Sequence, residues 1–213
     1  PAGKIEVTLD PPIAGAVSPT SFDLPIALAV LGIATDKVVV GELSLTGQVR
    51  GVCGVACLHG PGIVPEANAL EVDGALPAQD LAQVVRCLQG ETWPAAPVEL
   101  PARAYTHSLD WSDVRGHAQA KRALEVAAAG GHNVLLCGTP GTGRTMLARR
   151  LPTILPPMDP HEQREVTRLF SVAGLLLARC AGLSARPFRA PHHTASAAAL
   201  VGGGSVPRPG EVS

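Results

Sequence analysis

The stretch Gly138-Thr-Pro-Gly-Thr-Gly-Arg-Thr145 decides how the second half of this chain is interpreted. It follows the apolar run 134–137, which is predicted to be a buried strand, and it precedes the helix-forming run 146–151. A glycine-rich turn between a strand and a helix is the setting in which the pattern G-x-x-x-x-G-K-[ST] binds phosphate. The glycines let backbone N–H groups converge on phosphate oxygens, and the helix N-terminus adds a favourable dipole. We therefore expect a phosphate-binding loop.

All eight residues of this loop are expected to contact a nucleotide: Gly138, Thr139, Pro140, Gly141, Thr142, Gly143, Arg144 and Thr145. The hydroxyl of Thr145 stands where the pattern holds Mg²⁺. Arg144 departs from the pattern, which has lysine at this position. Arginine keeps the charge, but its planar guanidinium is larger and prefers bidentate contacts. Nucleotide binding is compatible with that change, whereas phosphoryl transfer depends on placed charge and is expected to suffer.

Composition offers a second explanation for Arg144. Lys4, Lys37 and Lys121 are the only lysines among the 17 basic residues, so a bias toward arginine accounts for the substitution by drift. That bias does not restore the geometry of a lysine.

Length and charge limit the classes of function. A chain of 213 residues suggests one or two domains, and a hydrophobic content of 46% is ample for a core. The net charge of −1 gives no overall attraction to nucleic acid or membranes, so DNA contact requires a local patch or assembly. The longest apolar run, 24–34, contains Pro25 and is too short to cross a bilayer. Five cysteines without a C-x-x-C pair fit a reducing compartment, and we expect a cytoplasmic protein without a membrane partner.

The pattern of apolar residues predicts an α/β chain. Strands are expected at 4–9, 38–40 and 42–45, with a turn at 46–47, and helices at 23–31, 81–88, 117–129 and from 159 to about 170. The proline-rich stretch from 93 to 109 lacks periodicity and is interpreted as a linker. The chain starts directly before a predicted strand and stops at Ser213 without a helix cap, so we expect a segment of a longer protein.

Several motifs together resemble the magnesium-chelatase-like AAA+ ATPases of the ComM (YifB) type. Besides the loop, these motifs are the stretches 113–116, 121–125, 127–133, 146–152, 171–174, 186–196 and 201–211. Residues 21–28 and 41–47 resemble the other domain of that family, which has the fold of the Lon protease domain. The resemblance implies a partial Lon-protease-like domain (ribosomal S5 domain 2-like) at 1–90, a linker at 91–112, and the N-terminal part of a P-loop AAA+ α/β domain at 113–213. It also implies that the Walker B acids, the sensors and the lid are absent.

The function implied by the resemblance is an ATP- and Mg²⁺-dependent motor. Such proteins assemble into rings, with a hexamer as the expected size, and act on branched DNA in recombination and natural transformation. In similar AAA+ proteins the segment of Val114 and Gly116 passes the adenine ring, although ordinary packing explains Val114 equally well. Three other readings remain: a nucleotide-binding subunit with impaired hydrolysis, a magnesium-chelatase motor subunit, and a Lon-type peptidase. The Lon-like domain argues against the second of these.

The peptidase reading depends on Ser21 and Leu58. Ser21 falls where Lon-type proteases have their nucleophile, and the partner lysine of that mechanism falls at Leu58. Without that lysine we expect a non-proteolytic domain, with Ser21 as a helix N-cap.

The remaining candidates are weaker. Adjacent His192 and His193 point in different directions, so joint metal binding is disfavoured against a role at a nucleotide or subunit interface, or an ordinary hydrogen-bonded histidine. Cys53 and Cys57 are expected to be small buried side chains on one helical face. Five arginines form either a basic surface for DNA phosphates or an ordinary solvated face: Arg149, Arg150, Arg186, Arg189 and Arg208.

Overall fold

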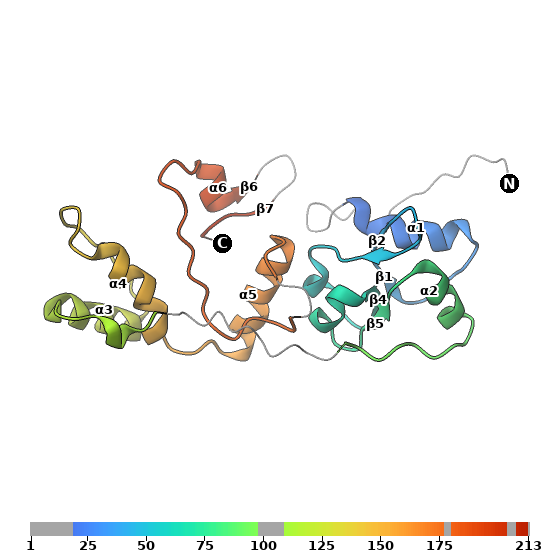
Figure 1. Ribbon diagram of the computed structural model, residues 1–213, viewed down its shortest axis with the longest axis horizontal. Helices are drawn as coiled ribbons and strands as arrows, with labels where there is room; N and C mark the ends of the chain where they lie inside the picture. Colours follow the sequence, from blue (N-terminus) through green and yellow to red (C-terminus); the bar gives the residue numbers. More distant parts are fainter. Residues whose placement is uncertain (1–18, 98–108, 177–179, 204–207, 213) are drawn as a thin grey trace. The chain divides into compact units, whose positions relative to one another are not determined.

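The computed structural model describes residues 19–97, 109–176, 180–203 and 208–212. The chain is α/β with a parallel sheet, as predicted (Figure 1). It divides into two compact units: the first lies within 1–102, 164–182 and 191–213, and the second within 103–163 and 183–190. The predicted strand at 4–9 and most of the predicted linker, 98–108, lie outside the described residues.

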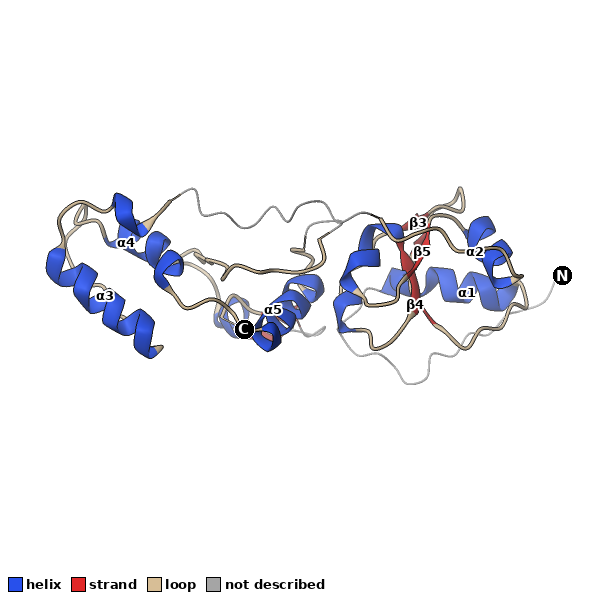
Figure 2. Cartoon of the chain, turned by 90° about the horizontal axis from the view of Figure 1, so that it is seen from below, coloured by secondary structure: helices blue, strands red, loops and turns tan. Residues whose placement is uncertain are grey.

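The sheet of the first unit has three parallel strands in the order β1 (Val38–Val39), β4 (Gly62–Pro65) and β5 (Leu76–Ala78). Val38 pairs with Gly62, and Ile63 pairs with Leu76. Figure 2 draws the strands in red and the helices in blue. A short antiparallel hairpin joins β2 (Glu42–Leu43) to β3 (Val49–Arg50) across the predicted turn. Strands β1 and β2 lie within the strands expected at 38–40 and 42–45, whereas β4 and β5 were not expected from the sequence.

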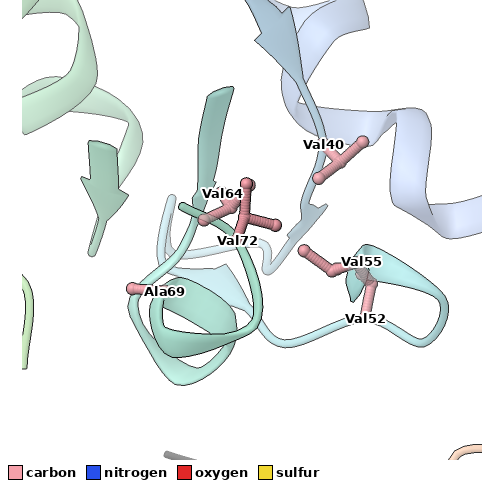
Figure 3. Packing of buried hydrophobic residues seen from close by; sticks show 6 residues of the cluster. All are labelled: Val40, Val52, Val55, Val64, Ala69 and Val72. Atoms are coloured by element: carbon pink, nitrogen blue, oxygen red, sulfur yellow. The ribbon is translucent and has the colours of Figure 1, made fainter. Parts of the chain in front are cut away.

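Successive side chains of β4 separate two apolar clusters, because neighbouring residues of a strand point to opposite faces. Ile63 packs with Leu24 and Leu28 of α1 (Asp23–Val30) and with Val84 of α2 (Leu81–Leu88). Val64 belongs to the second cluster, which also contains Val40, Val52, Val55, Ala69 and Val72 (Figure 3). The second cluster is covered by two 3-10 segments, η2 (Val55–Cys57) and η3 (Glu66–Glu71).

The start of α1 differs from the expectation for Ser21. The helix follows a 3-10 turn, η1 (Pro19–Phe22), and its N-cap residue is Phe22, which forms no side-chain cap. Ser21 lies inside η1 and is 0% exposed, and its hydroxyl has no hydrogen-bond partner among the described residues. The predicted N-cap role is therefore wrong, because the extra turn moves the helix start beyond Ser21.

The second unit consists of helices and loops in its described part. The elements are η4 (Trp111–Asp113), α3 (Ala118–Gly130), α4 (Arg144–Arg150), η5 (Leu151–Ile154) and the first turn of α5 (Pro160–Val172). A cluster of Trp111, Val114, Leu124 and Leu147 holds η4, α3 and α4 together. The residues of α5 from 164 onward belong to the first unit.

Two of these helices end or begin as the sequence predicts. Gly131 closes α3 in the left-handed conformation, with φ of 64°. The carboxylate of Asp159 accepts from the N–H of His161 at 2.7 Å and of Glu162 at 2.8 Å, and Glu162 Oε2 accepts from the N–H of Asp159 at 3.1 Å. This reciprocal pair is a capping box, and its hydrogen bonds, first that of Glu162, lower the pKa of Asp159.

The predicted buried strand at 134–137 is wrong. These residues form no strand, and the side chains of Val134 and Leu135 are 44% and 86% exposed. A strand needs neighbours that accept and donate its backbone hydrogen bonds. In the described residues of the second unit there is no other strand to supply them. Within the described residues the backbone of 134–137 therefore forms no strand hydrogen bonds.

The last described segment contains α6 (Ala197–Val201), β6 (Gly202–Gly203) and β7 (Arg208–Pro209), with the two strands antiparallel. Across the parts of the chain that the structure describes, no helix has the length and apolar character needed to span a bilayer.

Candidate functional site

The conformation of the loop explains its three motif glycines. Gly141 and Gly143 have φ of 84° and 81°, a region that residues with a side chain rarely adopt. A Cβ atom at Gly138 would lie 2.8 Å from the hydroxyl oxygen of Thr142, closer than side chains approach. The path of the backbone therefore favours glycine at 141 and 143, and the position of the Thr142 side chain leaves no room for a Cβ atom at 138.

The loop closes on the carbonyl of Thr139. The N–H and the hydroxyl of Thr142 both donate to this oxygen, at 3.4 and 2.8 Å. By contrast, the N–H groups of Gly141, Gly143 and Arg144 have no acceptor among the residues that the structure describes. Pro140 has no N–H and contributes only to the shape of the turn. The loop thus holds several unpaired donors close together, as an anion-binding loop requires.

Arg144 and Thr145 form the first two residues of α4, and both are exposed. Neither side chain has a hydrogen bond or an ion pair within the described ranges. The charge of Arg144 and the hydroxyl of Thr145 are therefore available to a ligand beside the unpaired N–H groups. This is the donor set that a phosphate with a bound divalent cation needs.

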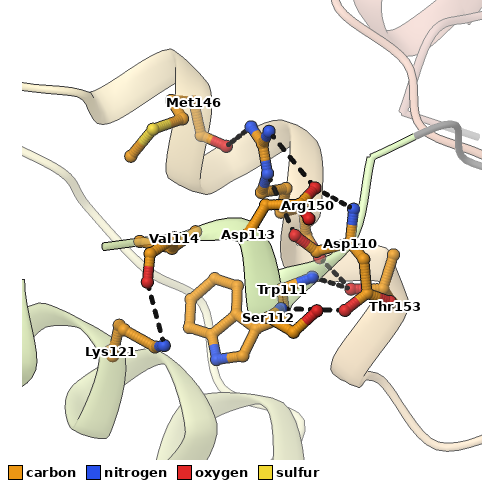
Figure 4. Close-up of polar contacts among 9 residues, drawn as sticks. All are labelled: Asp110, Trp111, Ser112, Asp113, Val114, Lys121, Met146, Arg150 and Thr153. Carbon is orange, nitrogen blue, oxygen red and sulfur yellow. Dashed lines mark hydrogen bonds and ion pairs between the residues drawn. The ribbon is translucent and has the colours of Figure 1, made fainter. Parts of the chain in front are cut away.

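The segment before α3 is fixed to the far end of α4 (Figure 4). Arg150 Nε donates to the carbonyl of Asp110 at 3.0 Å, and Arg150 Nη2 lies 3.6 Å from Asp113 Oδ2. Asp110 caps η4 by accepting from the N–H of Ser112 at 2.8 Å, and its own N–H donates to Asp113 Oδ2 at 2.9 Å. The hydrogen bonds from Ser112 lower the pKa of the Asp110 carboxyl. The position of residues 110–114 relative to the loop helix is thereby set.

Val114 is 4% exposed and packs with Trp111, Leu124 and Leu147. Its carbonyl accepts from Lys121 Nζ at 3.3 Å. Gly116 is exposed, with φ of 69°. Since the side chain of Val114 is used in the core, Val114 offers only its main chain to a nucleotide.

One residue beside the loop was missed by the sequence-based analysis. The ring of His117 lies against Gly143: a Cβ atom at that glycine would be 3.4 Å from His117 Nε2. The sequence contains no signal for this contact, because it depends on how α3 and α4 pack.

The other candidate residues have separate surroundings. The ring centroids of His192 and His193 are 4.1 Å apart, and His192 Nδ1 lies 2.7 Å from Thr194 Oγ1. No group of three metal-binding side chains occurs in the described ranges. Cys53 is exposed and lies outside any helix, so the expectation of a buried cysteine pair is wrong for it. Burial of the half-buried Cys57 raises the pKa of its thiol.

Arg150 and Arg186, which belong to the arginines proposed for a DNA surface, have partners within the protein. Arg150 binds Asp113 and Asp110, as described above. Arg186 Nη2 lies 2.8 Å from Glu162 Oε2, and Arg186 Nε donates to the carbonyl of Pro156 at 2.8 Å. These contacts reduce the charge that the proposed surface offers.

Comparison with known proteins places the loop in a family context. Residues 110–213 match the family described as magnesium chelatase, subunit ChlI. Over its whole length the chain is 42% identical to the competence protein ComM of Haemophilus influenzae. It is likewise 41% and 40% identical to the uncharacterized protein YifB of Salmonella typhimurium and of Escherichia coli. The predicted resemblance to the ComM (YifB) type is confirmed.

The match to the ComM type has a defined extent. The chain spans about half of these relatives, 46% of the length of each. The magnesium-chelatase match starts at Asp110, the residue that caps η4, and includes the whole loop.

Proposed function

We propose that this ComM-type chain binds ATP at residues 138–145 and belongs to a nucleotide-driven AAA+ motor. The observation that supports this most is the set of unpaired groups around one short loop. The N–H groups of Gly141, Gly143 and Arg144 have no acceptor among the described residues, and the side chains of Arg144 and Thr145 are exposed beside them.

In this proposal the unpaired N–H groups donate to phosphate oxygens, and the guanidinium of Arg144 balances their charge. The Thr145 hydroxyl is the candidate ligand for Mg²⁺. When bound there, Mg²⁺ would supply positive charge that offsets the charge developing on the phosphate. The main chain of Val114 and Gly116, held to α4 through Arg150, would lie along the base.

The work proposed for the motor is on DNA, in a cytoplasmic ring with a hexamer as its expected size. Support for this comes from the printed name of the Haemophilus influenzae relative, a competence protein. The net charge of −1 does not favour DNA binding by this chain as a whole. The magnesium-chelatase family match supports an alternative, a motor subunit that acts on a metal-insertion partner.

Residues 1–90 are interpreted as a Lon-like domain without protease activity. Ser21, at the position of the nucleophile, is 0% exposed, which leaves no access for a peptide. Leu58, at the position of the partner lysine, packs against the apolar cluster that contains Val40 and Val64. Neither residue offers the chemistry of a serine–lysine pair.

The test is a titration of the full-length protein with a fluorescent ATP analogue and Mg²⁺. Arg144→Ala is compared with Arg149→Ala, since both residues are exposed arginines of α4 and only Arg144 belongs to the loop. Loss of a charged hydrogen-bond donor should weaken binding about tenfold or more for Arg144→Ala, and Arg149→Ala should bind as the wild type does. Equal affinities for both variants, or no binding by the wild type, would contradict the proposal.

A further inference from the structure

The backbone of His117 is unusual. Its φ of 55° and ψ of 34° are left-handed, and no other non-glycine residue in the described ranges has a positive φ. This conformation is uncommon for residues with a side chain and persists where the surroundings impose it. Here the surroundings are well defined: Val114 is buried three residues earlier, and the carbonyl of His117 accepts the first hydrogen bond of α3 from Lys121 N at 2.8 Å.

The ring of His117 forms no local hydrogen bond that would offset the cost of its left-handed backbone. His117 occupies the N-cap position of α3, yet its side chain forms no cap. Neither ring nitrogen has a hydrogen-bond partner among the residues that the structure describes. Asparagine or glycine adopts the left-handed conformation more readily, so the backbone alone does not explain an imidazole here.

The direction of the ring is informative. A Cβ atom at Gly143 would lie 3.4 Å from His117 Nε2 and 3.6 Å from Cε1, so the imidazole lies against the last glycine of the loop. The N–H of Gly143 and the side chain of Arg144 next to it are unpaired within the described part of the chain. An exposed imidazole therefore stands beside the donors that are proposed to hold phosphate.

We infer that His117 is a further nucleotide-binding residue, whose ring N–H donates to a phosphate oxygen of the nucleotide in the loop. This inference rests on the proposed function. A neutral imidazole has one N–H and an imidazolium has two, so the ring can donate in either state. The strained backbone holds that donor at Gly143.

The test uses the full-length protein and two substitutions that the left-handed backbone accepts, His117→Gly and His117→Asn. His132→Asn is the matched control, because His132 is an exposed histidine of the same unit that lies outside the loop. Affinity is measured with fluorescent ADP, and inorganic pyrophosphate is then used as the competitor. Melting without nucleotide reports the structural effect.

Loss of one hydrogen bond to a charged group predicts about tenfold weaker binding of ADP and of pyrophosphate in both His117 variants. His132→Asn should bind as the wild type does, and His117→Gly should melt no earlier than the wild type. If both His117 variants bind normally while Arg144→Ala binds weakly, the inference about His117 is overturned and the proposed nucleotide site at 138–145 is retained. If ADP binding falls but pyrophosphate competition does not, the assignment of the contact to phosphate is wrong. If the wild type binds neither probe, the proposed function and the inference fail together.

Discussion

Ser21 shows how one side chain can oppose the stability of its own fold. Its hydroxyl is 0% exposed and has no hydrogen-bond partner among the described residues, while its carbonyl accepts from Gly41 N at 2.8 Å. A buried hydroxyl without a partner costs about 1–3 kcal/mol. We therefore expect Ser21→Ala to raise the free energy of unfolding by about 1 kcal/mol, measured by urea denaturation. A loss of stability in this variant would mean that the hydroxyl has a partner.

The residues of the loop illustrate what can be predicted from sequence at this scale. Glycine spacing predicts the loop because the left-handed backbone of Gly141 and Gly143 is a local property. The contact of His117 with Gly143 is not local, since the whole of α3 lies between these two residues in the sequence. The burial of Ser21 likewise depends on the 3-10 turn before α1, which no residue pattern announces.

At the scale of the elements, the end of α5 gives a structural role to two residues of the motif 171–174, Ser171 and Gly174. Ser171 Oγ donates to Glu71 Oε2 at 2.6 Å and accepts from Gly54 N at 3.1 Å, and Ser171 is 2% exposed. Gly174 has φ of 69°, and a Cβ atom there would lie 3.0 Å from Cys53 Sγ. Both residues thus hold the end of the helix against the polypeptide around η2 and η3, within the first unit.

Substitution of Ser171 should therefore have the opposite effect to substitution of Ser21. Ser171→Ala removes the hydroxyl that donates to the Glu71 carboxylate and accepts from Gly54 N, while Gly54 N keeps the Ser171 carbonyl as its other acceptor, at 3.0 Å. Because a hydrogen bond to a charged group is lost, we expect a loss of about 1–3 kcal/mol in the free energy of unfolding. Urea denaturation of the two variants side by side gives the comparison. An unchanged or increased stability of Ser171→Ala would show that the hydrogen bonds of Ser171 contribute nothing to stability.

The cap of η4 predicts a dependence on pH. The hydrogen bonds from Ser112, above all, lower the pKa of Asp110 in the folded protein. A lowered pKa means that the cap stabilises the fold above the unfolded pKa of about 3.9, and that this stability is lost as the pH falls through the folded pKa. Asp110→Asn keeps an accepting oxygen but has no carboxyl to titrate. Its stability should fall less than that of the wild type when the protein is melted at decreasing pH, and parallel curves would contradict this.

Elements that depend on distant partners are the ones that the sequence could not predict. Helices such as α3 and α5 are announced by local signals, the Gly130-Gly131 pair and the Asp159–Glu162 box. The apolar run 134–137 carries a strand-like composition but forms no strand, because a parallel strand obtains its hydrogen bonds from neighbours. An apolar composition predicts a buried strand correctly only where neighbouring strands are present to pair with it.

At the scale of the whole molecule, the two units differ in how completely their polar groups and apolar side chains are paired and packed. The first unit has a well-packed sheet with apolar clusters on both faces. The second has a loop whose donors are unpaired within the described residues, beside a small core. A protein that binds ATP tightly can still convert it slowly, because binding uses many backbone donors whereas turnover depends on the position of one charge. We expect Arg144 to be the residue that separates nucleotide affinity from turnover.

Exchange of Arg144 for lysine in the full-length protein should raise the rate of ATP turnover and leave nucleotide affinity nearly unchanged. Affinity is expected to persist because the N–H groups and a positive charge remain, whereas a misplacement of about 1 Å at the reacting phosphate can cost about a hundredfold in rate. The measurement is steady-state ATPase with DNA present, alongside nucleotide titration, for Arg144→Lys and for the control Arg149→Lys. Faster turnover only in Arg144→Lys would indicate a subunit whose hydrolysis is impaired by its arginine. If the natural protein already turns over as fast as Arg144→Lys, the guanidinium reaches the phosphate as well as an ammonium does, and the arginine is a neutral substitution in a working motor.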